Sequence, residues 1–258
     1  MSFDWVYDLD LAVLYPATIL LIAGAATLGN RIGRRPREAR NGSADIGTLT
    51  GAALGLLALL LGFNFSIALS RYDARRTMVL EEANAISSTA NFALMLPEPA
   101  QGAALRLLRD YADVRIGLGV PFDPAKLDRD ITRSLELQTQ LWQQAVAVTA
   151  AAPQSLPAYR FVLSLNEMNN IHERRLTALR YHVPVPVMFV LIGMAMVAMG
   201  FTGYHSGVTG TRRPVATLIM SLMVAMVIML VVDLDRPSHG TIHVPVQALV
   251  DAAQGMRP

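Results

Sequence analysis

The chain has 258 residues, of which 53% are hydrophobic and only 16% are charged, and its mean hydropathy is +0.38. Because a soluble domain usually carries about 25% charged residues, this composition indicates that part of the chain lies in a membrane, and it excludes a disordered chain or a coiled-coil rod. The chain has no cysteine, which excludes disulfides, thiolate metal sites and cysteine nucleophiles, and its net charge of +2 is too small to indicate nucleic-acid binding as a main role.

Four uncharged stretches are each long enough to cross a membrane, which takes about 20 mainly apolar residues. They cover residues 11–30, 46–69, 183–205 and 215–232. A helix buried in a soluble protein is rarely apolar on all sides over such a length, so four buried core helices are the weaker interpretation. The sequence therefore predicts four transmembrane helices.

A polar insert at residues 71–182 separates the second and third spans and carries most of the charge. Prolines divide it into pieces that are rich in helix-forming residues, and no run alternates apolar and polar residues like a strand. The pieces are about 71–96, 100–118, 124–150 and 158–182. Since no breaker separates the first piece from the second span, we expect one long helix over about 46–96.

The predicted fold class is an all-α membrane protein with four transmembrane helices and a helical extramembrane insert between the second and the third. Its expected parts are two spans in 1–70, the helical domain in 71–182, two spans in 183–235 and a C-terminal tail in 236–258.

Arginine is distributed unevenly over the loops. The short loops after the first and third spans contain Arg31, Arg34, Arg35, Arg37, Arg40, Arg212 and Arg213. Because positive charge in short loops favours the cytoplasm, these residues place both loops there and the insert outside, in the periplasm of a bacterium whose inner membrane holds the chain. The insert opposes this placement with arginines at its own two membrane ends, which are Arg71, Arg75, Arg76, Arg174, Arg175 and Arg180.

The second span has two features that bear on assembly. Gly47, Gly51 and Gly55 recur at intervals of four, and small residues at that spacing let helices approach closely. The row predicts helix packing, either inside one subunit or against symmetry copies around an axis. Asn64 and Ser66 near the far end of the span face protein or a water-filled pore, or lie at the membrane interface.

Several segments resemble bestrophins, in the same order and at comparable spacing over roughly residues 50–250. Segment 61–76 begins with Leu-Gly-Phe and continues to an arginine, an aromatic residue and further charge, as in the second membrane helix of bestrophins. Segment 173–186 begins with Glu-Arg and ends with Pro-Val-Pro, similar to the point where bestrophins re-enter the membrane. Segment 236–250 is similar to their turn and hydrophobic segment after the last span. Together with segment 81–86, these matches resemble the bacterial bestrophin-like proteins.

The resemblance implies a ring-shaped homo-oligomer, pentameric in bestrophins, with the second span lining an ion pore. By the Leu-Gly-Phe match, Phe63 would form the hydrophobic constriction, and stepping back along the same helix face leads to Leu59 and Gly55. The family usually has bulkier residues at those two positions, so Gly55 departs from it. Rings of apolar side chains can gate a pore by dewetting.

Charged residues at the two ends of the insert have two interpretations. Arg71, Arg75 and Arg76 at one end, and Glu173 and Arg174 at the other, form a charged, interfacial helix face or a permeation vestibule. An excess of arginine near the membrane favours an anionic permeant such as chloride.

Two properties of bestrophins are not expected from this sequence. Animal bestrophins bind calcium with the help of an acidic run after the last span, whereas residues 241–245 contain no carboxylate, so we expect no calcium site. Bestrophins also hold their insert in the cytoplasm, which is the reverse of the placement that the arginines favour.

Residue types that often mark catalytic or metal sites form no such pattern here. The five histidines are scattered, Glu81 and Glu82 point to different faces of a helix, and no nucleophile elbow or P-loop occurs. We therefore expect no catalytic residue, no metal site and no cofactor. Asp233 and Asp235 end the fourth span, either as an interfacial stop signal or as ion-pair partners of the arginines that follow the second span.

The sequence thus predicts a bestrophin-like oligomeric ion channel that conducts anions in preference to cations. The alternative is a membrane-anchored signalling or envelope scaffold whose insert senses or binds a partner; an enzyme is disfavoured because the spans contain no charged residue. Assembly discriminates between the two, since a channel needs an axial path and a scaffold does not. Expected partners are membrane lipid, the permeant ion and further copies of the chain, without nucleic acid.

Overall fold

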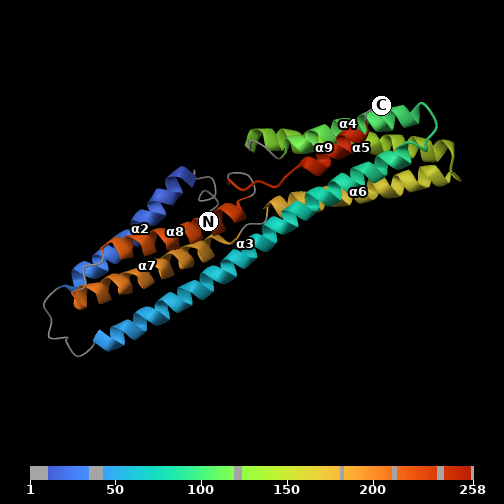
Figure 1. Cartoon of the computed structure of the whole chain (residues 1–258). Helices are drawn as coiled ribbons and strands as arrows, with labels where there is room; N and C mark the ends of the chain where they lie inside the picture. The colour runs from blue at the N-terminus through green and yellow to red at the C-terminus, as the bar shows by residue number, and fades with distance from the viewer. Residues whose placement is uncertain are drawn as a thin grey trace. The chain divides into compact units, whose positions relative to one another are not determined.

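The computed structural model of the chain describes residues 11–34, 43–118, 124–180, 183–210, 214–236 and 241–256. Within these ranges the chain forms eight helices and no strand (Figure 1), which confirms the predicted all-α fold. The helices are α2 (Leu11–Gly33), α3 (Ser43–Ala93), α4 (Ala100–Gly117), α5 (Pro124–Ala151), α6 (Leu156–Arg180), α7 (Val185–Val208), α8 (Pro214–Asp235) and α9 (Gln247–Gly255).

Four of the described helices, α2, α3, α7 and α8, are long and apolar enough to cross a membrane, which confirms the four predicted spans. As the sequence predicts, α3 continues without a break through 51 residues. At 1.5 Å per residue it is about 75 Å long, more than twice the ~30 Å hydrocarbon core of a bilayer. Only its apolar first half therefore needs to lie in a membrane.

Proline marks the start of several helices. Pro124, Pro157 and Pro186 stand in the first turn of α5, α6 and α7. Proline suits these positions because its missing N–H would have no partner in a first turn and its fixed φ is already helical. The helix boundaries in the insert therefore lie close to those expected from the prolines.

The chain forms two compact units, each of which is described by itself. The first combines Met1–Ser70 with His182–Ile242, and the second combines Arg71–Tyr181 with His243–Pro258. The helix α9, which lies in the C-terminal tail 236–258 expected from the sequence, thus belongs to the same unit as the insert.

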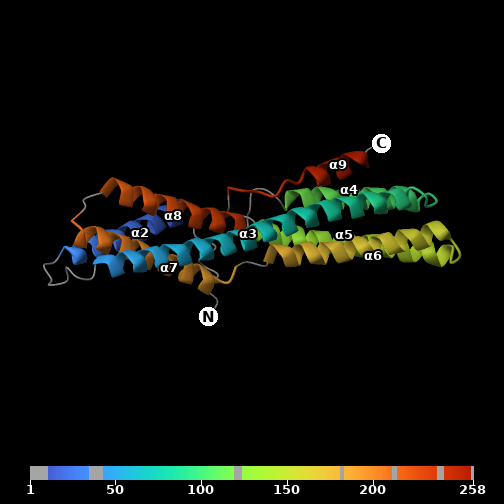
Figure 2. The same ribbon diagram turned by 60° about the horizontal axis from the view of Figure 1, so that its bottom comes forward.

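In the first unit, α2 and α7 lie backbone to backbone (Figures 1 and 2). A Cβ atom built at Gly203 of α7 would lie 1.9 Å from the carbonyl oxygen of Ala26, and one built at Gly29 of α2 would lie 2.1 Å from a carbonyl oxygen of α7. Gly33 and Gly207 repeat this close approach one turn further along. The two helices therefore meet through two Gly-xxx-Gly pairs, the small-residue packing typical of membrane helices.

The other spans complete the apolar core of the first unit. Ile22 of α2, Leu57 of α3, Leu191 of α7 and Ile228 of α8 belong to one cluster, and each is at most 2% exposed. One side of the first half of α3 is thus packed within the chain.

In the second unit, α4, α5, α6 and the second half of α3 lie side by side, with α9 against α4 (Figure 2). Five side chains without exposed surface form the centre of this core, namely Leu108, Leu141, Phe161, Leu165 and Leu249. Burial of this apolar surface is the main free-energy term that holds the four-helix arrangement and α9 together.

Candidate functional site

The apolar half of α3 has an open face as well as a packed one. The packed side carries the buried residues Leu57, Leu61, Asn64 and Ala68. They follow one another at spacings of four, three and four residues, which keeps them on one face of a helix. On the open side, the side chains of Leu59 and Phe63 are 54% and 60% exposed, and a Cβ atom built at Gly55 meets nothing within 4 Å. The three residues expected to line a pore therefore share one face that nothing else in the chain's described residues covers.

The two polar residues of this span lie in different surroundings. Asn64 is buried, its Nδ2 donates a hydrogen bond to the carbonyl of Leu60 at 2.8 Å, and it lines a cavity of about 210 Å³ together with residues of α7 such as Pro186 and Leu191. Ser66 is exposed. Asn64 is thus placed in contacts between α3 and α7, and Ser66 is the polar residue on the open side.

The glycine row of α3 makes little contact inside the chain. A Cβ atom at Gly47 would lie 3.5 Å from Nε2 of His205, an ordinary contact, and one at Gly51 would meet nothing within 4 Å. Packing of this row against another copy of the chain stays a prediction, with open space at Gly51 to accommodate it.

The charged residues expected at a vestibule differ in exposure. Arg75 is buried, Arg71 is half-buried and Arg76 is exposed. Among the second group, Glu173 is exposed, while Nη2 of Arg174 donates a hydrogen bond to Glu167 at 2.7 Å. Only the exposed members can meet a permeant ion in a single chain, and their vestibule role stays a prediction.

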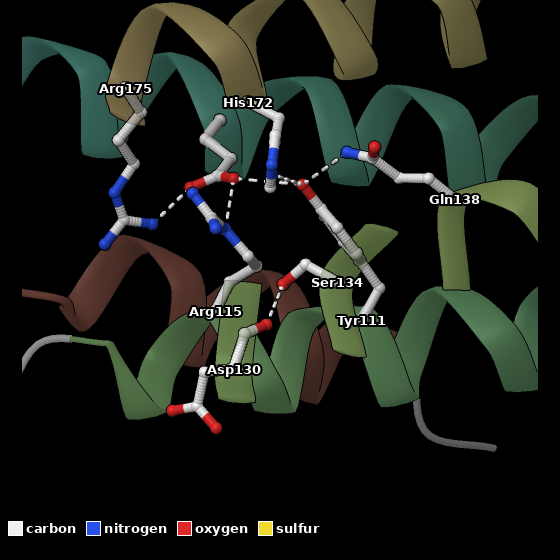
Figure 3. A network of polar contacts seen from close by, with 8 residues as sticks. Tyr111, Arg115, Asp130, Ser134, Gln138, His172 and Arg175 are labelled. Atoms are coloured by element: carbon white, nitrogen blue, oxygen red, sulfur yellow. Dashed lines mark hydrogen bonds and ion pairs between the residues drawn. The ribbon is translucent and has the colours of Figure 1, made fainter. Parts of the chain in front are cut away.

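Glu82 lies at the centre of a buried polar network in the second unit (Figure 3). Its Oε1 accepts hydrogen bonds from Nε of Arg115 at 2.6 Å and from the hydroxyl of Tyr111 at 3.1 Å, and its Oε2 accepts one from Arg175. Glu82, Tyr111 and Arg115 have no exposed surface, and Arg175 is 4% exposed. One carboxylate thus joins three helices, α3, α4 and α6.

The hydroxyl of Tyr111 connects this carboxylate to two further side chains. Nε2 of Gln138 donates to it at 3.3 Å, and Nδ1 of His172 lies 3.1 Å away. Because the hydroxyl has one proton and a carboxylate is the strongest acceptor nearby, Tyr111 donates to Glu82. Nδ1 of His172 then carries a proton, which it donates to the hydroxyl oxygen.

The charges of the network follow from burial and from its two guanidinium groups. Burial alone would raise the pKa of the Glu82 carboxyl, but Arg115 and Arg175 outweigh burial and hold that pKa below its ordinary value. Burial, reinforced by the same two arginines, lowers the pKa of His172 to about 4. Burial lowers the pKa of Arg175 as well, but a guanidinium group stays protonated in proteins. At neutral pH the network therefore contains one negative charge, two positive charges and a neutral histidine.

This network is not among the sites expected from the sequence, although a signal for it exists. Arg115 continues the buried row of α4 formed by Ala104, Leu108 and Tyr111, at spacings of four, three and four. Likewise Arg175 continues a buried row of α6. A charged residue in the apolar register of a helix indicates a buried ion pair, because a buried charge needs a partner.

The two acidic residues at the end of α8 accept hydrogen bonds within the first unit. Oδ1 of Asp233 accepts one from the backbone N–H of Thr241 at 2.6 Å, and Oδ2 of Asp235 accepts one from the backbone N–H of Val183 at 2.8 Å. These bonds tie the two segments that flank α7 and α8 to the end of the fourth span.

In the described part of the chain, no three histidine, aspartate or glutamate side chains gather closely enough to hold a metal ion. His182 and His239, two of the five histidines, lie outside the described residues.

Comparison with known proteins finds a family match over most of the chain and solved structures with a similar fold. A model of the Bestrophin-like domain matches residues 17–249. The fold is similar to that of a bacterial Bestrophin homolog from Klebsiella pneumoniae, with a TM-score of 0.66 and 16% identity over 93% of this chain and 100% of that one. A single-residue variant of that homolog gives a TM-score of 0.67 and 14% identity over 93% and 95% of the two chains.

No curated protein matches the chain. The family model nevertheless covers most of its length, and it includes all the motifs whose order resembles bestrophins except the last residue of the final segment. The protein is therefore a multi-pass membrane protein that belongs to the Bestrophin-like family.

Proposed function

We propose that copies of this chain assemble around an axis into an ion channel whose pore is lined by α3. The observation that carries the proposal is the open face of α3, where Leu59 and Phe63 are more than half exposed at the positions that match the bestrophin constriction. Membership in the Bestrophin-like family supports it. By the same resemblance, we expect five copies.

In such a ring, every copy contributes one Phe63 side chain at the same height. A ring of aromatic side chains expels water from a narrow passage and so blocks ions without a moving gate. Leu59 lies one turn away and extends the apolar passage, while Gly55 widens it because it has no side chain. Exposed arginines such as Arg76 favour an anion over a cation, with chloride as the expected permeant.

The test is ion flux through purified full-length protein in liposomes. Phe63→Ala removes one aromatic ring per subunit, widens the constriction and lowers its dewetting barrier, so anion flux should rise or become constitutive. Phe189→Ala is the matched control, because Phe189 lies in another span, α7, and is similarly exposed, at 52% against 60% for Phe63. It should leave flux nearly unchanged.

Two measurements accompany this comparison. Particle imaging must give the same ring for both variants, so that altered flux is not a loss of assembly. If neither wild type nor Phe63→Ala passes chloride or potassium under any imposed gradient, the channel proposal fails.

A scaffold function is the second candidate, and one feature of the second unit favours it. A groove of about 720 Å³ runs between α3, α4 and α9, and its lining includes Asn84, Asn91, Arg109 and Asp251. A mixture of polar and apolar lining suits a peptide segment of another protein. A dimer without an axial opening, in the same particle images, would favour this candidate over the channel.

A further inference from the structure

The guanidinium group of Arg115 uses only part of its bonding capacity. It has five N–H donors, and its Nε–H binds Glu82 at 2.6 Å. Nη1 and Nη2 are buried and have no hydrogen-bond partner among the described residues. The ring of Tyr111, 5.9 Å from Cζ, offers only a weak cation–π contact.

The charges around Arg115 do not balance. Glu82 is the only carboxylate among the buried side chains described in the second unit, and it is shared between Arg115 and Arg175. Asp130 of α5 does not supply a second one, because its carboxylate points away from Arg115 in Figure 3. Since His172 is neutral, one positive charge is left over among the described residues of this buried network.

Two different deficits therefore coincide at one group. Buried N–H donors need acceptors, and a buried positive charge needs a negative one, because an uncompensated buried charge strongly destabilises a fold. A water molecule would meet the first need and leave the second unmet. An anion meets both, and the fork of two terminal nitrogens is the part of arginine best suited to hold one.

We propose that Nη1 and Nη2 of Arg115 bind a small monovalent anion, of chloride or bromide size, inside the helical unit formed by Arg71–Tyr181 and His243–Pro258. A single negative charge neutralises the network of Glu82, Arg115 and Arg175. The complete burial of Arg115, Tyr111 and Ser134 restricts the site to an ion without a hydration shell of its own and without bulky substituents. The site lies in the second unit, outside the apolar half of α3 that carries Leu59 and Phe63.

The test uses bromide as the probe, since its anomalous X-ray signal distinguishes it from water. Full-length protein is extracted, purified and crystallised with sodium bromide in place of sodium chloride, because a closed site exchanges slowly. We expect an anomalous peak within hydrogen-bonding distance of Nη1 and Nη2 of Arg115 in the wild type. The peak should remain in Arg106→Met, which changes an exposed arginine of the same helix, and should vanish in Arg115→Met.

A second measurement decides the matter if Arg115→Met does not fold. The melting temperature of wild type and Arg106→Met should be higher in sodium bromide or chloride than in sodium gluconate of equal ionic strength, because gluconate is too large to enter. Ordinary water density beside Arg115 without an anomalous peak, or equal melting temperatures in all three salts, would overturn the proposal. Neither result depends on ion flux, so the channel proposal stands or falls separately.

Discussion

Gly203 is the position where a single methyl group should disturb the membrane helices most. A Cβ atom there would lie 1.9 Å from the carbonyl oxygen of Ala26, whereas ordinary contacts begin near 3.4 Å. Because the obstacle is backbone and no rotamer change can relieve it, α2 and α7 would have to separate by about 1.5 Å. A gap of about 0.5–1 Å already forfeits a quarter to a half of the dispersion attraction between facing atoms.

Gly203→Ala should therefore cost about 3 kcal/mol, the upper end of the usual range for overpacking. For a chain of this size that corresponds to a melting temperature lower by roughly 2–4 °C per kcal/mol. The matched control is Gly193→Ala on the same helix, where an added Cβ meets nothing within 4 Å. There the better helix propensity of alanine should stabilise the protein by up to about 1 kcal/mol.

The measurement is thermal unfolding of the two full-length variants in the same detergent. Gly203→Ala should melt well below wild type, and Gly193→Ala at or above it. If Gly203→Ala melts as high as Gly193→Ala, the close crossing of α2 and α7 is not a tight contact and the reasoning fails.

Three further predictions concern the second unit and the orientation of the chain. Glu82→Gln should lower the free energy of unfolding by about 3–5 kcal/mol because it leaves two buried guanidinium groups without a carboxylate. The control Glu81→Gln, at a partly exposed site, should cost at most about 1 kcal/mol. Equal melting temperatures of the two variants would contradict this prediction. Burial lowers the pKa of His172 from 6.5 to about 4, so on acidification the unfolded chain takes up the proton before the folded chain does. The free energy of unfolding should therefore fall as the pH drops from about 6.5 to 4, and His172→Gln should make that fall smaller. The same pH dependence in the variant and the wild type would count against this prediction. A topology reporter fused at Gly42 should read as cytoplasmic and one at Gly102 as periplasmic, because short arginine-rich loops favour the cytoplasm; the reverse pattern would establish the bestrophin orientation instead.

Local patterns were sufficient to predict the membrane segments and the long helix. Uncharged runs of about 20 residues have few alternatives to a membrane span, and a proline-free stretch such as 43–96 has no reason to break. The order of the bestrophin-like motifs can also be recognised in the sequence, because the Leu-Gly-Phe segment and the Pro-Val-Pro segment each consist of neighbouring residues. These features indicate the family without reference to any contact between helices.

The candidate site was predicted only in part. Helical periodicity predicts that Phe63 and Leu59 share one face, and the structure places both on the open side of α3. Asn64 has the same polar character as Ser66 and lies two residues away, yet it is buried against α7. Periodicity determines which residues share a face, but it cannot tell which face meets another helix.

The sequence by itself determined where the chain enters a membrane, where its helices begin and end, and which family it belongs to, because hydropathy, helix breakers and contiguous motifs are properties of neighbouring residues. Only the tertiary structure decided that Gly29 and Gly203 form the crossing of α2 and α7 and that α9 packs with the insert. It alone placed Glu82 between Arg115 and Arg175, which stand 33 and 93 residues further along the chain. Such contacts depend on which faces of distant helices meet, and that choice is made by packing of the whole core rather than by any local pattern.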